Sequence, residues 1–118
     1  MVMTEPQMVI VIRRDLKLPK GKIAVQAAHA AASLVLKTKG TALFTEWIHL
    51  GQKKIALWAQ DEAHLLAIKR DAQDRNLPTV LIKDAGRTVV AAGTTTCIGI
   101  GPADAEDLET ITGELPLI

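Results

Sequence analysis

Four polar side chains recur along one stretch of the sequence at the spacing of an α-helix surface. Lys22, Gln26, His29 and Ser33 follow one another at intervals of four, three and four residues. At about 100° per residue, these positions fall within roughly 60° of one another on a helix. The sequence between them is almost purely small and apolar, mainly alanine. An ammonium, an amide, an imidazole and a hydroxyl on one face can bind a polar substrate and move a proton.

A polar helix face is most often the solvated side of an amphipathic helix, and that ordinary interpretation competes with a site. An acid much later in the chain favours the site. Asp84 directly follows an apolar, strand-like run and stands two residues before Gly86. An acid at a strand end beside a polar helix face is a common way to build a site on an α/β scaffold. We expect Asp84 to orient the His29 imidazole or to polarise a water molecule.

Hydroxyl groups follow this acid in the sequence. Thr88 and the run Thr94-Thr95-Thr96 would orient water or bind a carbonyl or ribose oxygen. β-branched residues are also common wherever a strand begins. Because Thr94 and Thr96 share one face of a strand, at most one side of this run can serve a site.

Several familiar catalytic motifs are absent from the sequence. There is no Walker loop, no GxGxxG and no GxSxG elbow. The three histidines lack metal-ligand spacing, so neither a metal nor another cofactor is expected. The lone Cys97 lies in an apolar strand without flanking positive charge, which predicts a small core residue rather than a nucleophile. Hydrolytic chemistry would therefore use an activated water molecule.

Apolar patterning predicts alternating strands and helices, bounded by glycine, proline and capping residues. Such an order is typical of an α/β fold with a mixed or mainly parallel sheet and helices on both faces. Ligands of these sheets gather at strand carboxyl ends, where Arg13-Arg14, Asp84 and the helix start at Lys22 would meet. The expected strands are 8–12, 55–59, 79–82 and 95–100, and the expected helices are 22–36, 41–50, 62–75 and 103–112.

Length and composition indicate one domain over residues 1–118, with residues 1–7 as a flexible N-terminus. Aromatic residues make up 3% of the chain, which argues against nucleic-acid recognition by base stacking. A single cysteine fits a reducing compartment, and no apolar run has the length of a membrane span. We therefore expect a cytoplasmic protein.

The net charge of +1 hides a division along the chain. Residues 1–60 carry a balance of +6 and residues 61–118 a balance of −5. Helix N-termini also favour anions, so Lys20-Gly21-Lys22 would seat a phosphate. Scattered lysines that only increase solubility are the alternative. The asymmetry indicates an electropositive face carried by the first half of the chain, which includes Arg13 and Arg14 and suits a phosphate.

Two segments resemble the signatures of the archaeal and eukaryotic, type 2, family of peptidyl-tRNA hydrolases. They are GKIAVQAAHAAAS (residues 21–33), and LIKDAGRT (81–88) followed by AAGTTTCIGIGP (91–102). The middle and end, LGQKKIAL (50–57) and TGELPL (112–117), are also similar in character. The resemblance covers roughly residues 8–118.

The resemblance implies a single-domain, three-layer α/β/α fold with a four-stranded mixed sheet, generally as a homodimer. It also implies hydrolysis of the ester between a peptide and the 3′ ribose of tRNA. Under this hypothesis Asp84, alone or with His29, activates water, Lys22 and a threonine hydroxyl stabilise negative charge, and Gln26 positions the substrate. The family's functional residues fall on Lys22, Gln26, His29, Asp84, Thr88 and Thr96, and its tRNA-binding basic positions on Lys20 and Arg87.

Two other classes of function fit parts of the pattern. An RNA-binding module would keep the basic face but need neither Asp84 nor His29, and it would cleave no ester. An interaction or regulatory protein on a dimeric α/β scaffold would tolerate charge reversal at Lys20 and Lys22. Ester cleavage and charge reversal therefore separate the three classes.

Overall fold

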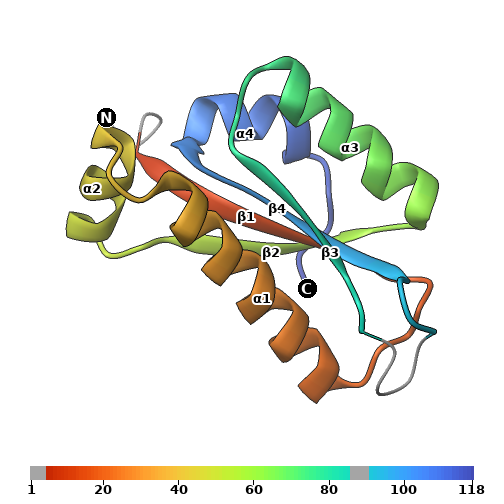
Figure 1. Ribbon diagram of the computed structural model, residues 1–118. Coiled ribbons are helices and arrows are strands. Elements are labelled where there is room, and N and C mark those ends of the chain that lie inside the picture. Colours follow the sequence, from red (N-terminus) through yellow and green to blue (C-terminus); the bar gives the residue numbers. More distant parts are fainter. Residues whose placement is uncertain (1–4, 86–90) are drawn as a thin grey trace.

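The structure, a computed structural model, describes residues 5–85 and 91–118. These residues alternate between strands and helices, as the apolar pattern predicts (Figure 1). The strands are β1 (Pro6–Arg13), β2 (Lys54–Ala59), β3 (Thr79–Lys83) and β4 (Thr95–Asp104), and the helices are α1 (Lys20–Thr38), α2 (Ala42–His49), α3 (Glu62–Asp74) and α4 (Ala105–Thr112). None of the helices in these ranges has the length and apolarity that a membrane crossing needs.

The strands form one mixed sheet in the order β2-β1-β4-β3. β1 is parallel to β2, and β4 is antiparallel to both β1 and β3. The carboxyl ends of β1 and β3 and the start of β4 therefore meet at one end of the sheet. Although the alternating order also allowed a mainly parallel sheet, only one neighbouring pair in the described ranges is parallel.

Helices cover both faces of the sheet, so the predicted three-layer α/β/α architecture is confirmed (Figure 1). Successive residues of a strand point to opposite faces, and β1 is apolar on both. Met8, Ile10 and Ile12 pack with residues of α1 and α2, and Val9 and Val11 pack with residues of α3 and α4. A continuous apolar run is thus the sequence of a central strand between two helical layers.

The end of β4 was predicted wrongly. The pattern ended the strand before Gly101-Pro102, but β4 continues to Asp104 and α4 begins at Ala105. The pairing of β1 with β4 shifts register between Gln7 and Val9, and such bulges tolerate proline. Gly101 has a φ of 115°, a conformation that glycine adopts readily.

The other helix and strand boundaries differ from those predicted from the sequence by a few residues at most. β1 starts at Pro6, so two residues that were expected in the flexible N-terminus belong to the sheet. α1 is longer than expected at both ends. Asp61, the expected N-cap of α3, accepts a hydrogen bond from the His64 backbone N–H at 2.8 Å.

α1 lies unusually close to the sheet at Gly99 of β4. A Cβ atom at this position would lie 2.7 Å from Leu34 Cδ1 and 3.3 Å from Ala30 Cβ. Leu34 and Ala30 are fully buried residues of α1. The absence of a side chain at Gly99 therefore lets the helix approach β4 closely.

Candidate active site

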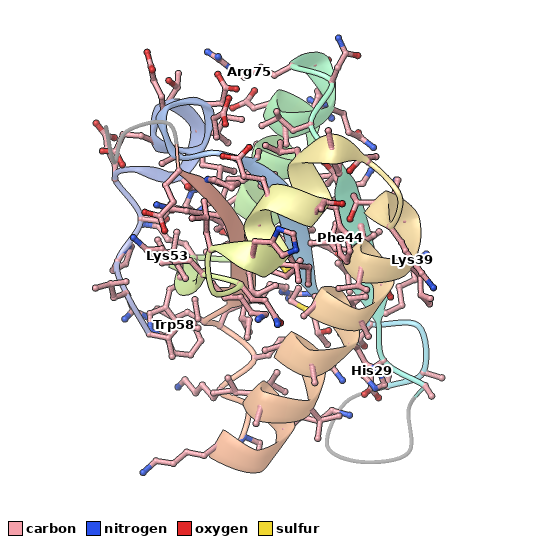
Figure 2. The ribbon with its side chains drawn as sticks, turned by 90° about the vertical axis from the view of Figure 1, so that its left-hand side faces the viewer. His29, Lys39, Phe44, Lys53, Trp58 and Arg75 are labelled. Carbon is pink, nitrogen blue, oxygen red and sulfur yellow. The ribbon has the colours of Figure 1, made fainter. Side chains whose placement is uncertain are left out.

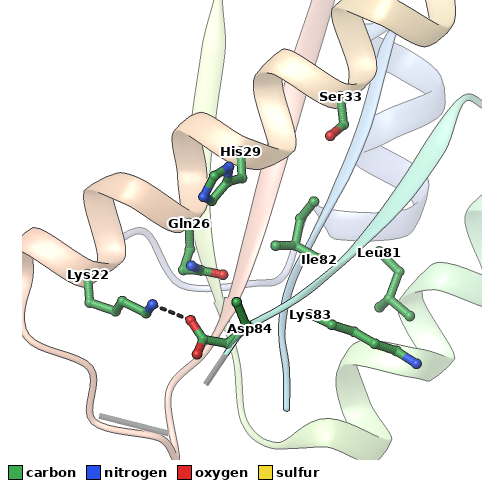
Figure 3. A pocket seen from close by; sticks show the side chains of 9 residues that line it. Lys22, Gln26, His29, Ser33, Leu81, Ile82, Lys83 and Asp84 are labelled. Carbon is green, nitrogen blue, oxygen red and sulfur yellow. Dashed lines mark hydrogen bonds and ion pairs between the residues drawn. The ribbon is translucent and has the colours of Figure 1, made fainter. Parts of the chain in front are cut away.

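A cleft of about 490 Å³ lies between α1 and the end of β3 (Figure 3). One wall carries the polar side chains that the helical spacing placed on one face of α1, and the other is the C-terminal half of β3 with the residues that follow it. The lining residues are Lys22, Gln26, His29, Ser33, Leu81, Ile82, Lys83, Asp84 and Ala85. The structure therefore brings the helix face and the distant acid to a single cleft.

A buried ion pair closes one end of this cleft. Lys22 Nζ, in the first turn of α1, donates a hydrogen bond to Asp84 Oδ1 (Figure 3). The Asp84 side chain is 2% exposed and the Lys22 side chain 13%. A buried carboxylate is tolerable only with such a partner, because the lost hydration must be replaced. The pair joins the helix start to the sheet at the expected strand end.

The main chain holds Asp84 in place on the side of β4. Its N–H donates to the Thr94 carbonyl at 2.8 Å, and its carbonyl accepts from the Gly93 N–H at 2.8 Å. These two main-chain hydrogen bonds, together with its side-chain contacts, fix the position of Asp84.

Gln26 is buried, although a polar helix face ordinarily faces solvent. Its residue exposure is 2%, and its Oε1 accepts a hydrogen bond from the Thr96 hydroxyl of β4. The same hydroxyl lies 3.3 Å from the Ile82 carbonyl, and its single proton serves one acceptor at a time. Gln26 Nε2 has no hydrogen-bond partner in the described ranges and is not enclosed, so it opens on the cleft.

His29 and Ser33 lie further along the helix wall. Figure 2 shows His29 on the side of α1 next to β3, and Figure 3 shows its imidazole above Gln26. His29 is exposed, and within residues 5–85 and 91–118 no hydrogen bond or ion pair involves its ring. The expected contact between the imidazole and Asp84 is therefore not formed in this structure.

The arginines at the end of β1 do not line the cleft. Arg13 donates from Nη1 to the Thr95 carbonyl at 3.0 Å and pairs with Asp15 at 2.8 Å and Glu62 at 3.8 Å. The Arg13 hydrogen bond lowers the pKa of Asp15, and Asp15 in turn raises the pKa of Arg13. Arg13 is thus occupied by contacts inside the fold that link β1, β4 and α3.

Two further basic positions remain exposed. The Arg14 guanidinium lies 5.5 Å from the centre of the Trp58 ring. Figure 2 shows Trp58 on the far side of α1 from His29. Lys20 is the first residue of α1, whose N-cap, Pro19, makes no side-chain cap hydrogen bond. The first turn of α1 also lacks acidic residues, so its free N–H groups and its lysines favour an anion there. Arg87 and Thr88, both expected in the site, lie outside the described residues.

The sequence did not point to the β3 wall of the cleft. Leu81, Ile82 and Lys83 read as an ordinary strand, and only the strand order places β3 at the sheet edge beside α1. No local signal distinguishes an edge strand of this length from a central one. Another cleft, of about 790 Å³, lies next to α4 and β2, and none of the described residues that line it is an expected site residue.

Cys97 is a core residue of β4, as its apolar surroundings suggest. It is fully buried, and burial raises the pKa of its thiol to about 12. A thiol with such a pKa is a poor nucleophile at neutral pH. In the part of the chain that the structure describes, no three His, Cys, Asp or Glu side chains are grouped as metal ligands.

Known proteins of similar sequence match almost the whole of this chain. The family model of peptidyl-tRNA hydrolase PTH2 matches residues 6–118. Peptidyl-tRNA hydrolase of Methanopyrus kandleri is 46% identical, with 93% of this chain and 96% of that protein covered. The enzyme of the same name from Sulfurisphaera tokodaii is 47% identical, with 95% and 98% covered.

A eukaryotic relative and a solved structure extend the likeness. Probable peptidyl-tRNA hydrolase 2 of Drosophila melanogaster is 42% identical over 95% of this chain and 61% of its own length. A solved protein of unknown function from Agrobacterium has a TM-score of 0.68 at 14% identity, covering 98% of this chain and 99% of its own, and shows a shared fold. On the match of the family model and the identity of these relatives, the chain belongs to the PTH2 family of peptidyl-tRNA hydrolases.

Proposed function

We propose that this chain hydrolyses the ester between a peptide and the 3′ ribose of tRNA in the cleft between α1 and β3. The observation that carries the proposal is the buried Lys22–Asp84 pair beside the Gln26 amide, in a chain of the PTH2 family. Ester hydrolysis needs a proton acceptor for the attacking water and a positive or polar group for the developing oxyanion. The pair supplies both at one end of the cleft.

In this mechanism the Asp84 carboxylate accepts a proton from water as the water oxygen attacks the ester carbonyl. The Lys22 ammonium and the Gln26 amide N–H stabilise the negative charge on the carbonyl oxygen. The tetrahedral intermediate then collapses, the bond to the ribose 3′ oxygen breaks, and this oxygen takes the proton that Asp84 accepted from water. The peptide leaves as a carboxylic acid and Asp84 is again a carboxylate. Asp84 is assigned as the base because the sheet fixes its position, whereas no described residue orients the His29 ring.

The positions of Thr96, His29, Lys20 and Arg14 support roles for these four residues in the proposed reaction. Thr96 acts through Gln26, since its hydroxyl is hydrogen-bonded to the amide oxygen and would set the direction of the amide nitrogen. His29 lines the cleft where the leaving ribose or the peptide would pass. Lys20 and Arg14 are exposed basic groups for the tRNA backbone, and Arg87 is a further basic position from the second signature. Thr88 belongs to the expected catalytic residues, with a hydroxyl that would orient water or bind a carbonyl or ribose oxygen.

The proposed activity is tested by release of tRNA from N-acetyl-aminoacyl-tRNA at neutral pH, with a chelator present. Asp84→Asn keeps the shape of the side chain but removes the base, so kcat/KM should fall by about a hundredfold or more. Asp74→Asn, at the exposed end of α3, is the matched control and should keep the wild-type rate. A folded Asp84→Asn protein with wild-type turnover would refute the mechanism. Salt-sensitive tRNA binding without cleavage by the wild type would instead indicate a binding module.

We also propose that the chain acts as a homodimer in the cytoplasm, where translation provides its substrate. An apolar stripe on the outer face of α1 supports self-association. Val25, Ala28, Ala32 and Leu36 recur at helical spacing and are all exposed, Leu36 at 79%. The molar mass in solution, measured by light scattering, tests this assembly, and Leu36→Glu should shift it toward the monomer.

A further inference from the structure

The cleft continues well beyond the ion pair, along the line between α1 and β3. The two elements run in opposite directions, because Lys22 at the start of α1 meets Asp84 after β3. At the other end, Lys37 Nζ donates to the Thr79 carbonyl at 2.9 Å and closes the space between the helix and the start of β3. The cleft is therefore a groove with the reacting groups at one end.

β3 is an edge strand of the sheet, so half of its main-chain groups face away from β4. The hydrogen bonds at the start of β3 show which residues direct their main-chain groups away from β4. The Pro78 carbonyl accepts from the Gly101 N–H at 2.9 Å on the β4 side, whereas the Thr79 carbonyl accepts from Lys37 on the opposite side. Because N–H and C=O directions alternate along a strand, the N–H and C=O groups of Leu81 point toward the open edge.

The end of the strand gives the same alternation. The Ile82 carbonyl lies 3.3 Å from the Thr96 hydroxyl, and the Asp84 N–H donates to the Thr94 carbonyl, so both residues face β4. Lys83, between them, consequently directs its N–H to the open edge. Leu81 and Lys83 both line the cleft. The open edge thus offers the Leu81 carbonyl and the N–H groups of Leu81 and Lys83, none of which has a hydrogen-bond partner among the described residues.

We propose that the peptide part of peptidyl-tRNA binds as an added strand on the open edge of β3, parallel to it, in the groove beside α1. One peptide residue donates its N–H to the Leu81 carbonyl and accepts from the Lys83 N–H, as in a parallel ladder. This inference rests on the proposed ester hydrolysis and specifies where the acyl group lies.

The direction of the peptide follows from charge and from the place of the ester. The tRNA is an anion and belongs at the start of α1, where Lys20 and the free helix N–H groups lie. The ester lies beside Asp84, and the peptide then extends from its C-terminal residue toward Ser33. A peptide whose C-terminus is at Asp84 runs in the same direction as β3.

The length of the groove suits a short peptide segment. Gln26 and Ser33 are separated by about 10 Å along the helix axis at 1.5 Å per residue, which is room for roughly three extended residues. Hydrogen bonds to main-chain groups do not depend on the peptide's side chains. Recognition by strand addition therefore suits an enzyme whose substrates carry many different peptides.

The first test varies only the substrate, with wild-type enzyme. We expect kcat/KM for N-acetyl-trialanyl-tRNA to exceed that for N-acetyl-alanyl-tRNA by about tenfold, the effect of one or two additional hydrogen bonds. N-methylation of the trialanyl group, one nitrogen at a time, should abolish this preference at the position that donates to Leu81. Equal rates for the two substrates, with no effect of methylation at any nitrogen, would overturn the inference.

The second test removes the edge N–H from the enzyme. Lys83→Pro deletes the N–H that faces the open edge without deleting a bond to β4, and edge positions tolerate proline. Lys83→Ala also removes the side chain but keeps the N–H. We expect Lys83→Ala to retain the preference for the trialanyl substrate and Lys83→Pro to lose it, and thermal melts establish that both are folded.

The outcomes separate this inference from the proposed function. Cleavage of neither substrate by the wild type would reject the ester hydrolysis itself. Cleavage of both, with the same preference in Lys83→Pro and Lys83→Ala, would reject strand addition while leaving the hydrolysis in place. If Lys83→Pro does not fold, the N-methylated substrates decide the question with the wild-type protein.

Discussion

At the scale of single residues, the contact between Thr96 and Gln26 decides what the cleft offers a substrate. A glutamine amide presents either an acceptor or two donors, depending on how it is turned. The Thr96 hydroxyl donates to the amide oxygen and so leaves the nitrogen for the cleft. Thr96 is therefore a positioning residue, whose hydroxyl orients the Gln26 amide.

This argument predicts different results for two substitutions of Thr96. Thr96→Val has nearly the same shape but leaves the buried Gln26 oxygen without its donor, so we expect about 1 kcal/mol less stability and a kcat roughly tenfold lower. Thr96→Ser keeps the hydroxyl and should retain most of kcat. Steady-state kinetics and denaturant unfolding of both variants measure these effects. Equal kcat values for the two would show that the hydroxyl does not position the amide.

At the scale of elements, Arg13 connects β1, β4 and α3 through its side-chain contacts. It extends from the end of β1, donates to the Thr95 carbonyl at the start of β4 and pairs with Asp15 and with Glu62 of α3. Thr96 follows directly in β4, so the arginine helps to fix the strand that carries the positioning hydroxyl. A planar guanidinium can make these contacts together, which an ammonium cannot.

We expect Arg13→Gln to lower the free energy of unfolding by about 1 kcal/mol. We also expect a lower kcat, because the first residues of β4, which include Thr96, lose the hydrogen bond from Arg13. Arg14→Gln, whose parent side chain is exposed over Trp58, is the matched control for stability and should change it little. Chemical denaturation of the three proteins at pH 7 provides the comparison, and equal stability of the Arg13 and Arg14 variants would contradict the assigned role.

The stability difference should also depend on pH in a defined direction. Arg13 lowers the pKa of Asp15 from its ordinary value of 3.8. A lowered pKa in the folded state means that the contribution is present above about pH 4 and is lost as the pH falls. The gap between wild type and Arg13→Gln should therefore narrow in acid.

At the scale of the whole molecule, charge is divided between the two helical layers. α1 carries Lys20, Lys22 and Lys37 and no acid, whereas α4 carries Glu106, Asp107 and Glu109 and no base. The basic layer contains the helix wall of the cleft, and the acidic layer covers the opposite face of the sheet. The molecule can thus orient a polyanion toward the cleft before close contact.

This division of charge predicts that kcat/KM depends less on salt concentration when a positive charge near the cleft is removed. For Lys20→Gln, the plot of log kcat/KM against log salt should become less steep by about 0.7 to 0.9, the effect of one lost phosphate contact. Lys69→Gln, in α3 on the other face, changes the net charge equally and should leave the slope unchanged. Identical slopes for the two variants would place the tRNA away from the start of α1.

The sequence by itself determined the element order, the α/β class, the polar face of α1 and the acid at the end of β3. Helical and strand periodicities are local, and the N-cap at Asp61 and the helix face of Lys22, Gln26 and His29 can be read from neighbouring residues. The family signatures combine such local patterns, which is why the family could be identified from the residues alone.

Only the tertiary structure decided which of these residues meet and which are buried. The burial of Gln26, its contact with Thr96 and the internal pairing of Arg13 depend on groups that lie far apart in the chain. The bulge that carries β4 past Pro102 and the open edge of β3 depend on strand order and register. These features arise from non-local packing, for which a single sequence has no periodic signal.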